Sequence, residues 1–235
     1  MNTIKLHFCF SNRHIASSQN RSFADGVRLK LTPLFDKMNE EADEHAEDTF
    51  QSLRAGTSWE GGPDESELAE QALEAGIEHY EDLMFVKGQL MALAAAGLYH
   101  LWERTLKSFI IRELSHYGLA DNDRAKILRA DFPTLRGWLV GMGFPTEQPV
   151  LLSDLNLLSL IANVAKHGEG ASFEKLVALA PEFVEGPYGA MMGISMTSAD
   201  GLWITPERFD RLATAVDRFW ESLPEWLPVT TGPEQ

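Results

Sequence analysis

The sequence predicts an all-α protein, an antiparallel helical bundle with long central helices and shorter helices packed around them. Apolar residues recur at helical spacing in every segment that has a clear pattern, most densely over residues 80–114. Thr32-Pro33 and Thr205-Pro206 are typical helix starts, because Thr caps the first free N–H groups and Pro fits the first turn. With 235 residues, 44% of them hydrophobic, the chain can bury a substantial core.

The first 31 residues and the last 12 lack this pattern. Residues 1–31 are mixed and polar, and we expect a loose N-terminal extension with one short strand near Ile4–Phe10. Residues 32–223 are predicted to form a single helical domain. Residues 224–235 hold three prolines and are predicted to be a flexible tail.

Two helices are predicted in the first half of this domain. The first runs from Thr32-Pro33 to about Arg54 and is followed by a Gly- and Pro-containing loop at 55–63. The second is a long stretch over 64–117, buried on more than one side and therefore central. We expect a kink or break in it near Gly76, since an interior glycine costs about 1 kcal/mol relative to alanine.

The second half is predicted to contain shorter helices. Their starts and ends are marked by Ser, Thr, Pro and Gly residues. The predicted ranges are 123–130, 134–141, 154–167, 172–180 and 205–223. A glycine-rich loop is expected at 186–193 and a short extended segment at 201–204.

The negative charge is concentrated in one segment. Residues 36–82 carry 16 acidic and 2 basic side chains, whereas the rest of the chain is nearly neutral, although the whole chain has a net charge of −15. A local basic cleft therefore remains compatible with the composition. No apolar run is long enough to span a membrane, the N-terminus lacks a signal-peptide pattern, and Cys9 is the one cysteine. We expect a cytoplasmic protein with no cofactor and no metal.

The first candidate site is a polar face on the apolar helix predicted at 154–167. Asn163, Lys166 and His167 are spaced i, i+3 and i+4, so they share one helix face. An amide, an ammonium and an imidazole can bind a phosphate or carboxylate, and the imidazole can transfer a proton near neutral pH. The alternative is a helix C-terminus, where Lys and His interact favourably with the helix dipole.

The second candidate site lies in the middle of the most apolar helix. His100 and Arg104 are four residues apart, as are Tyr99 and Glu103, and Lys107 follows one turn later. Charged groups in such a helix must be paired or reach solvent. They are expected either to form a structural ion pair or exposed stripe, or to line one cleft with the first candidate site.

Metal and nucleotide motifs are weak or absent. Glu113 and His116 form one Glu-x-x-His unit, but the sequence has no second such unit of the kind that carboxylate-bridged di-iron bundles use. There is no phosphate-binding loop, dinucleotide fingerprint, nucleophile elbow or His-Glu-x-x-His motif.

The motif Ala162-Asn163-Val164-Ala165-Lys166-His167 resembles that of HEPN domains, which carry Arg-(Asn/Asp/His)-x-x-x-His near the end of a late helix. Asn163 and His167 match the motif, while Ala162 stands at the position of its Arg. Residues 98–104 also resemble the acidic, aromatic-rich central helix of these bundles. The resemblance covers about residues 66–170.

The HEPN resemblance implies a protein that binds or cleaves RNA, in stress or phage defence. Several HEPN proteins are metal-independent ribonucleases that act as homodimers, and others are inactive or are partners of nucleotidyltransferases. It implies His167 as acid/base and Asn163 as its orienting group or a phosphate ligand. Lys166 and Arg104 would stabilise charge, with Glu103 positioning one of them and His100 lining the cleft. The alternative is a non-enzymatic interaction protein whose acidic segment 36–82 binds a basic partner.

Overall fold

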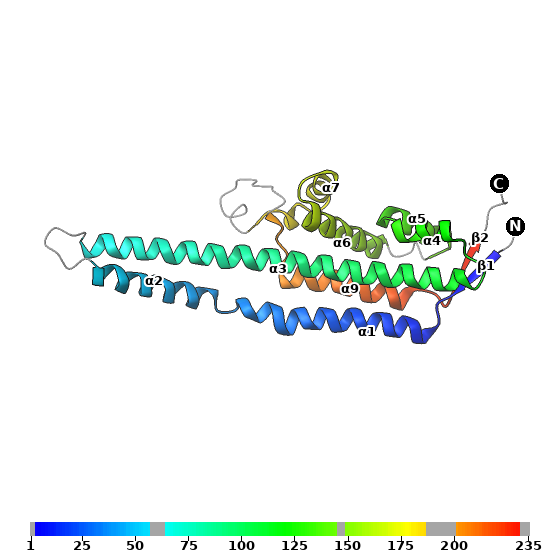
Figure 1. The fold of residues 1–235 in the computed structure, drawn as a ribbon, viewed down its shortest axis with the longest axis horizontal. Helices are drawn as coiled ribbons and strands as arrows, with labels where there is room; N and C mark the ends of the chain where they lie inside the picture. The colour runs from blue at the N-terminus through cyan, green and yellow to red at the C-terminus, as the bar shows by residue number, and fades with distance from the viewer. Residues whose placement is uncertain (1–2, 57–63, 145–148, 187–200, 231–235) are drawn as a thin grey trace.

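The protein is a helical bundle with a small β-ribbon at one end (Figure 1). The computed structural model describes residues 3–56, 64–144, 149–186 and 201–230. The helices are α1 (Phe10–Gly26), α2 (Met38–Gly56), α3 (Glu65–Ser115), α4 (Asp121–Arg129), α5 (Phe132–Gly141), α6 (Pro149–His167), α7 (Ala171–Leu179) and α9 (Pro206–Ser222). The predicted all-α class is confirmed.

The 51-residue helix α3 runs through the whole molecule. At 1.5 Å per residue it is about 77 Å long. Its first turn is capped by the Asp64 side chain, which accepts hydrogen bonds from the backbone N–H groups of Ser66 and Glu67. In Figure 1, α2 and α1 lie end to end along one side of α3, whereas α4, α5, α6 and α7 lie on the opposite side. α3 is the central helix, as predicted.

The predicted break near Gly76 does not occur, because α3 is continuous there. A Cβ atom added at Gly76 would lie 2.9 Å from the Ala46 Cβ and 3.0 Å from the Ala42 carbonyl oxygen. Gly76 therefore allows α2 and α3 to approach closely. The conformational cost of the glycine is offset by this contact, and the helix continues through Gly76.

The N-terminal segment is not the loose extension that we expected. β1 (Thr3–His7) is followed by the helix α1, and then by a π-helical turn at Val27–Leu31 and a 3-10 turn at Thr32–Phe35. The predicted strand is present but shorter, and Thr32-Pro33 starts the 3-10 turn rather than α2 itself.

α1 was missed because the face that it buries consists of small and polar residues. That face consists of Ala16, Ser17, Asn20 and Ala24, which give no hydrophobic stripe in the sequence. α1 is instead fixed to α9 by polar contacts. The Arg21 guanidinium lies 2.7 Å from the Asp217 carboxylate, and the Ser17 hydroxyl donates to the same carboxylate over 3.1 Å.

The predicted flexible tail contains a strand. β2 (Trp226–Thr230) pairs antiparallel with β1, with Leu6 opposite Leu227 and His7 opposite Trp226. Leu6 and Leu227 are buried, and burial of these apolar side chains stabilises a ribbon that would be marginal alone. Residues 231–235 lie outside the described residues.

The helices of the second half follow the prediction closely. Gly118 and Gly168 have φ angles of +80° and +71°, as expected for glycines that end helices. α6 starts at Pro149, so Ser153 lies inside it rather than capping it. The Thr205 side chain caps α9 as predicted. Most of the loop predicted at 186–193 lies outside the described residues, and in the segment 201–204 the Trp203 N–H donates to the Phe183 carbonyl.

The core lies where α3, α6 and α9 meet. Trp102 of α3 is fully buried and packs edge-to-face on Phe219 of α9, with ring centroids 5.1 Å apart. Phe219 also contacts Phe144 and Trp220. Large aromatic side chains thus pack α9 against α3 at the centre of the bundle, while α6 contributes buried aliphatic side chains such as Leu155, Leu158 and Ile161.

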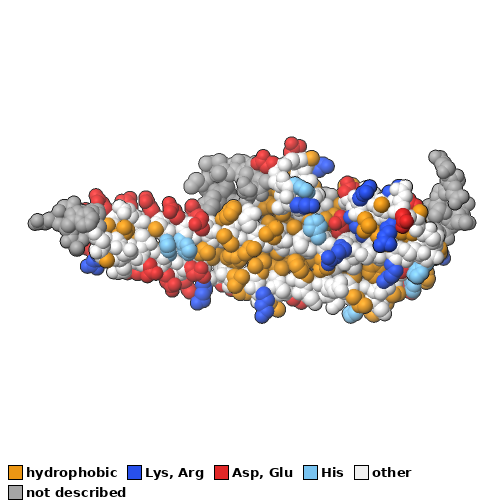
Figure 2. Space-filling view, viewed as in Figure 1, with side chains coloured by type: hydrophobic (Ala, Val, Ile, Leu, Met, Phe, Trp, Pro, Cys, Tyr) orange, Lys and Arg blue, Asp and Glu red, His pale blue; other side chains and the backbone are white. Residues whose placement is uncertain are grey.

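We call residues 38–56 and 65–84 the arm, and the other described residues the body. In Figure 1 the arm extends beyond the body at one end. It carries 13 acidic and 1 basic side chains, and acidic side chains line its upper and lower edges in Figure 2. None of the described helices is long and apolar enough to cross a membrane.

Candidate functional site

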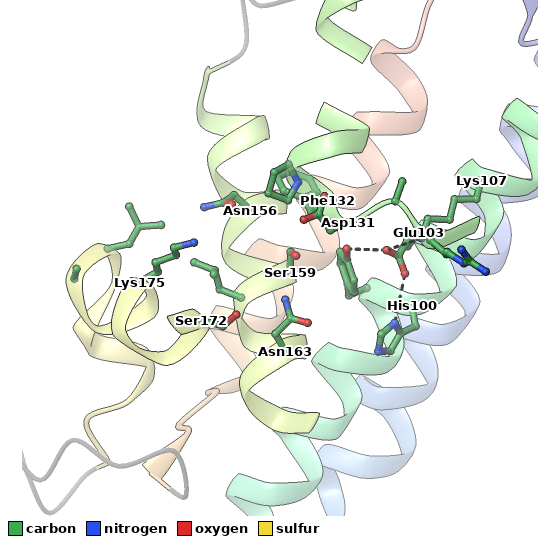
Figure 3. Close-up of a pocket in the computed structure, with 17 residues that line it drawn as sticks. His100, Glu103, Lys107, Asp131, Phe132, Asn156, Ser159, Asn163, Ser172 and Lys175 are labelled. Atoms are coloured by element: carbon green, nitrogen blue, oxygen red, sulfur yellow. Dashed lines mark hydrogen bonds and ion pairs between the residues drawn. The ribbon is translucent and has the colours of Figure 1, made fainter. Parts of the chain in front are cut away.

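A cavity of about 650 Å³ opens between α3 and α6. The link between α4 and α5 and the helix α7 form its other walls (Figure 3). Its polar lining residues are Tyr99, His100, Glu103, Lys107, Arg129, Asp131, Asn156, Ser159, Asn163, Ser172 and Lys175. We call this cavity the polar pocket.

The α3 wall of the polar pocket is a hydrogen-bonded chain of three side chains. The Glu103 carboxylate accepts a hydrogen bond from the Tyr99 hydroxyl at 3.0 Å and one from the Lys107 ammonium at 3.1 Å. Lys107 also donates to the Leu128 carbonyl oxygen. Both charged groups of this pair are largely buried, and each has a partner of opposite charge. The predicted structural ion pair is therefore present and it also lines a pocket.

The Tyr99 hydroxyl donates its hydrogen bond to Glu103 and stays protonated. Burial raises the pKa of Tyr99 far above its ordinary value of 10.0, and the hydrogen bond with the Ser159 side chain opposes this effect. The hydroxyl therefore keeps its proton at physiological pH. Because Tyr99 contacts Glu103 on α3 and Ser159 on α6, it links the two main walls of the pocket.

His100 lies at the rim, whereas Arg104 does not line the polar pocket. The His100 Nδ1 atom is 3.7 Å from the Glu103 carboxylate, and the imidazole is about half exposed. Arg104 lines a smaller cavity of about 450 Å³ on the α1 side of α3, together with Phe23 and His100. Glu103 thus contacts His100 and Lys107 and is not seen to position Arg104.

The α6 wall carries a stripe of polar side chains. Asn156, Ser159 and Asn163 are spaced i, i+3 and i+7, so they lie on one face of the helix, and Figure 3 shows them on the pocket side. Our sequence reasoning selected Asn163 but missed the other two. The signal was available, because two amides seven residues apart interrupt an otherwise apolar helix.

Lys166 and His167 lie apart from the polar pocket. Both are exposed in the last turn of α6, and neither lines the pocket. The Gly168 N–H donates to the Val164 carbonyl at 2.8 Å, which ends the helix directly after His167. This placement fits the alternative interpretation, in which Lys and His act at a helix C-terminus. Their role in chemistry stays a prediction.

Two cations stand at the rim without a carboxylate partner among the described residues. Arg129 ends α4 and Lys175 lies on α7, and both are exposed. The nearby Asp131 caps α5, and hydrogen bonds from the Thr134 side chain and backbone hold the pKa of Asp131 below its ordinary value of 3.8. Asp131 is therefore negatively charged, while Arg129 and Lys175 remain available to an anionic ligand.

Glu113, of the Glu113-x-x-His116 unit, connects α3 to the N-terminal strand. The Glu113 carboxylate accepts a hydrogen bond from the His7 backbone N–H at 3.1 Å and pairs with Arg112. Across the described residues, no group of three or more His, Cys, Asp and Glu side chains is arranged to hold a metal ion.

The chain shows no significant match to a family model, to a curated protein or to a solved structure. The HEPN resemblance therefore depends on the motif and on the helix pattern alone.

The lining of the polar pocket suits a polar ligand that carries an anionic group. The amides of Asn156 and Asn163 can each donate and accept hydrogen bonds, and Leu160 and Phe132 supply apolar surface beside them. The cations Arg129 and Lys175 stand at the rim. The predicted meeting of residues 100–107 with Asn163 is present, but Arg104, Lys166 and His167 are not part of it.

Proposed function

We propose that this is a HEPN-like RNA-binding protein, and that the polar pocket holds a nucleotide of single-stranded RNA. The observation that supports this best is the convergence of two amides of α6 with the rim cations Arg129 and Lys175. Single-stranded RNA is recognised by hydrogen bonds to the edges of unstacked bases and by stacking on side chains. Cations bind the phosphates and make the affinity depend on salt.

The proposed binding uses each wall of the pocket differently. Asn156 and Asn163 hydrogen-bond to the base edge, and the apolar surface of Leu160 and Phe132 contacts the base. Lys175 and Arg129 contact the flanking phosphates. The Glu103–Lys107 pair holds Tyr99 in place, so the pocket is formed before the ligand arrives.

Metal-independent cleavage is the catalytic form of this proposal. His100 is the imidazole at the pocket rim, and its contact with Glu103 orients it as an acid/base group. The HEPN resemblance assigns this role to His167 instead, completed by the second subunit of a homodimer. Variants of the two histidines distinguish the two assignments.

The test is the binding and cleavage of a fluorescent single-stranded RNA by the purified protein with a metal chelator present. Asn163→Ala and Lys175→Ala are each expected to weaken binding about tenfold, equivalent to about 1.4 kcal/mol. Arg218→Ala is the matched control, because Arg218 is an exposed cation on α9 outside the pocket. His100→Ala is expected to abolish any cleavage and to leave binding largely intact.

Equal affinity of wild type, Asn163→Ala and Lys175→Ala for RNA would contradict the pocket assignment. Loss of cleavage in His167→Ala but not in His100→Ala would move the catalytic site to the end of α6. Absence of RNA binding by the wild-type protein would contradict the proposal as a whole.

The alternative function is that of an interaction protein, and the shape of the arm favours it. The arm extends beyond the body, so its 13 acidic side chains are accessible to a partner. In this case a basic peptide binds the arm, and binding weakens with salt. The polar-pocket variants leave that binding unchanged, which separates the two functions.

A further inference from the structure

A second cavity lies at the other end of the body from the arm. It has a volume of about 700 Å³ and is bounded by the end of α3, the helices α4 and α5, and the β-ribbon. We call it the apolar pocket. Its lining is mainly hydrophobic and includes Ile110, Leu114, Ile127, Trp138, Met142 and Val229. Pockets of this size and lining are typical of small-molecule sites.

Two exposed glycines of α5, Gly137 and Gly141, line the apolar pocket, and neither packs closely against a neighbouring element. A Cβ atom added at Gly137 or Gly141 would meet nothing within 4 Å. Neither residue has a positive φ angle. Gly137 lies in the interior of a helix, where glycine costs about 1 kcal/mol relative to alanine.

These glycines contrast with those that pack against a neighbouring helix. A Cβ atom at Gly76 would clash with Ala46, and one at Gly97 would lie 2.9 Å from the Phe23 ring. Gly76 and Gly97 thus permit close contact between helices. Gly137 and Gly141 instead line the apolar pocket beside Trp138 and Met142, and the space next to their Cα atoms is unoccupied.

The rim of the apolar pocket carries one positively and one negatively charged side chain. Lys126 and Asp123 line it and form an exposed ion pair at 2.9 Å. Exposed pairs of this kind contribute little to stability, so the ammonium group is available to another anion. The Tyr117 hydroxyl, also at the rim, donates to the Lys5 carbonyl oxygen and ties the end of α3 to the ribbon.

We infer that the apolar pocket binds a small amphipathic molecule with an apolar chain and an anionic end, such as a medium-chain carboxylate. The chain lies against Ile110, Leu114 and Ile127 and occupies the space beside Gly137 and Gly141. The carboxylate pairs with Lys126 in place of Asp123. This site is separate from the polar pocket and does not depend on RNA binding.

The test uses dodecanoate and its neutral counterpart dodecanol, both below the concentration at which they form micelles. Binding to the full chain is measured by calorimetry and by the fluorescence of Trp138, with Trp138→Phe as the spectroscopic reference. Saturable one-to-one binding of dodecanoate is expected. Lys126→Ala should weaken the binding of dodecanoate about tenfold and leave that of dodecanol unchanged.

Gly137→Leu fills the pocket and is expected to weaken the binding of both ligands at least tenfold, as is Gly141→Leu. Gly137→Ala is the matched control, since it adds one methyl group in open space and favours the helix. Thermal unfolding of each variant shows whether the fold is retained.

Two results would overturn this inference. One is the absence of saturable binding of dodecanoate, or binding that both leucine variants leave unchanged. The other is a dimer of the wild-type protein that Gly137→Leu dissociates while dodecanoate has no effect, which would assign the pocket to a second copy of the chain.

Discussion

The two halves of α3 pack in different ways. In the arm, most of the buried residues are small, and α3 contacts α2 closely where Gly76 faces Ala46. In the body, the same helix contacts several elements through large side chains such as Trp102 and Leu106, both fully buried. One uninterrupted helix thus takes part in a two-helix hairpin and in a bundle core.

This difference indicates where the stability of the molecule lies. Hydrophobic stabilisation is roughly proportional to the apolar area that is buried, and the arm buries few large side chains. Leu73 and Ile77, for example, are exposed in the arm. We therefore expect the arm to open locally at a lower free energy than the body, although the backbone hydrogen bonds of α3 are continuous.

The largest expected effect comes from Trp102→Ala in the body. Removal of this fully buried ring should lower the free energy of unfolding by about 3–5 kcal/mol, because it leaves a cavity between α3, α5 and α9. Urea unfolding followed by circular dichroism measures the loss. Leu73→Ala in the arm is the control and should change stability by less than about 0.5 kcal/mol. Similar losses in both variants would contradict the comparison.

A smaller and local effect is expected from Gly76→Leu in the arm. The new side chain cannot fit against Ala46, so α2 must separate from α3, at a cost of about 1–3 kcal/mol. Hydrogen exchange should become faster at residues 38–56 and 65–84 and stay unchanged around Trp102. Gly137→Ala, an interior helical glycine with open space beside it, should be neutral or stabilising. Faster exchange throughout the body would show that the two halves do not open independently.

The smallest effect concerns the carboxylates that cap helices in each half. Asp131 of the body accepts hydrogen bonds from Thr134, and Asp131→Ala should cost about 1 kcal/mol at neutral pH. Because folding lowers the pKa of Asp131, its contribution is present above its ordinary pKa of 3.8 and is lost as the pH falls below that value. The stability difference between wild type and Asp131→Ala should therefore shrink between pH 5 and about pH 3. A difference that stays constant over this range would contradict the proposed cap.

Asp64, which directly precedes the arm segment 65–84, is the corresponding cap of α3, and hydrogen bonds from Ser66 and Glu67 lower its pKa. Asp64→Ala is expected to increase hydrogen exchange in the first turn of α3 alone. Exchange at Thr134, in the first turn of α5, serves as the internal reference for this measurement.

The elements that could be predicted are those whose buried residues recur at helical spacing or whose ends carry capping residues. α9 and the second half of α3 have apolar residues at helical spacing, and Thr205-Pro206 marks the start of α9. α1 leaves no such pattern, since it is held by Arg21 and Ser17 against Asp217, about 200 residues away in the chain. The continuity of α3 at Gly76 also depends on a partner helix that the sequence does not place.

The candidate site was predicted in part for the same reason. Glu103 and Asn163 could be assigned to helix faces from their spacing, and both line the polar pocket. Lys175 was not predicted, because its position depends on how α7 packs on α6. His167 shares a sequence motif with Asn163 but is the last residue of α6 and is exposed. Gly168, with a φ angle of +71°, ends the helix directly after it.

The pairing of β1 with β2 has a consequence for the topology of the chain. It places Thr3 directly opposite Thr230, so a short peptide linker can join the two ends of the described chain without moving a helix. New ends can then be opened between α2, which ends at Gly56, and α3, which begins at Glu65. A circularly permuted protein made in this way should fold to the same bundle, because spatial contacts and not the order of the helices along the chain determine this structure.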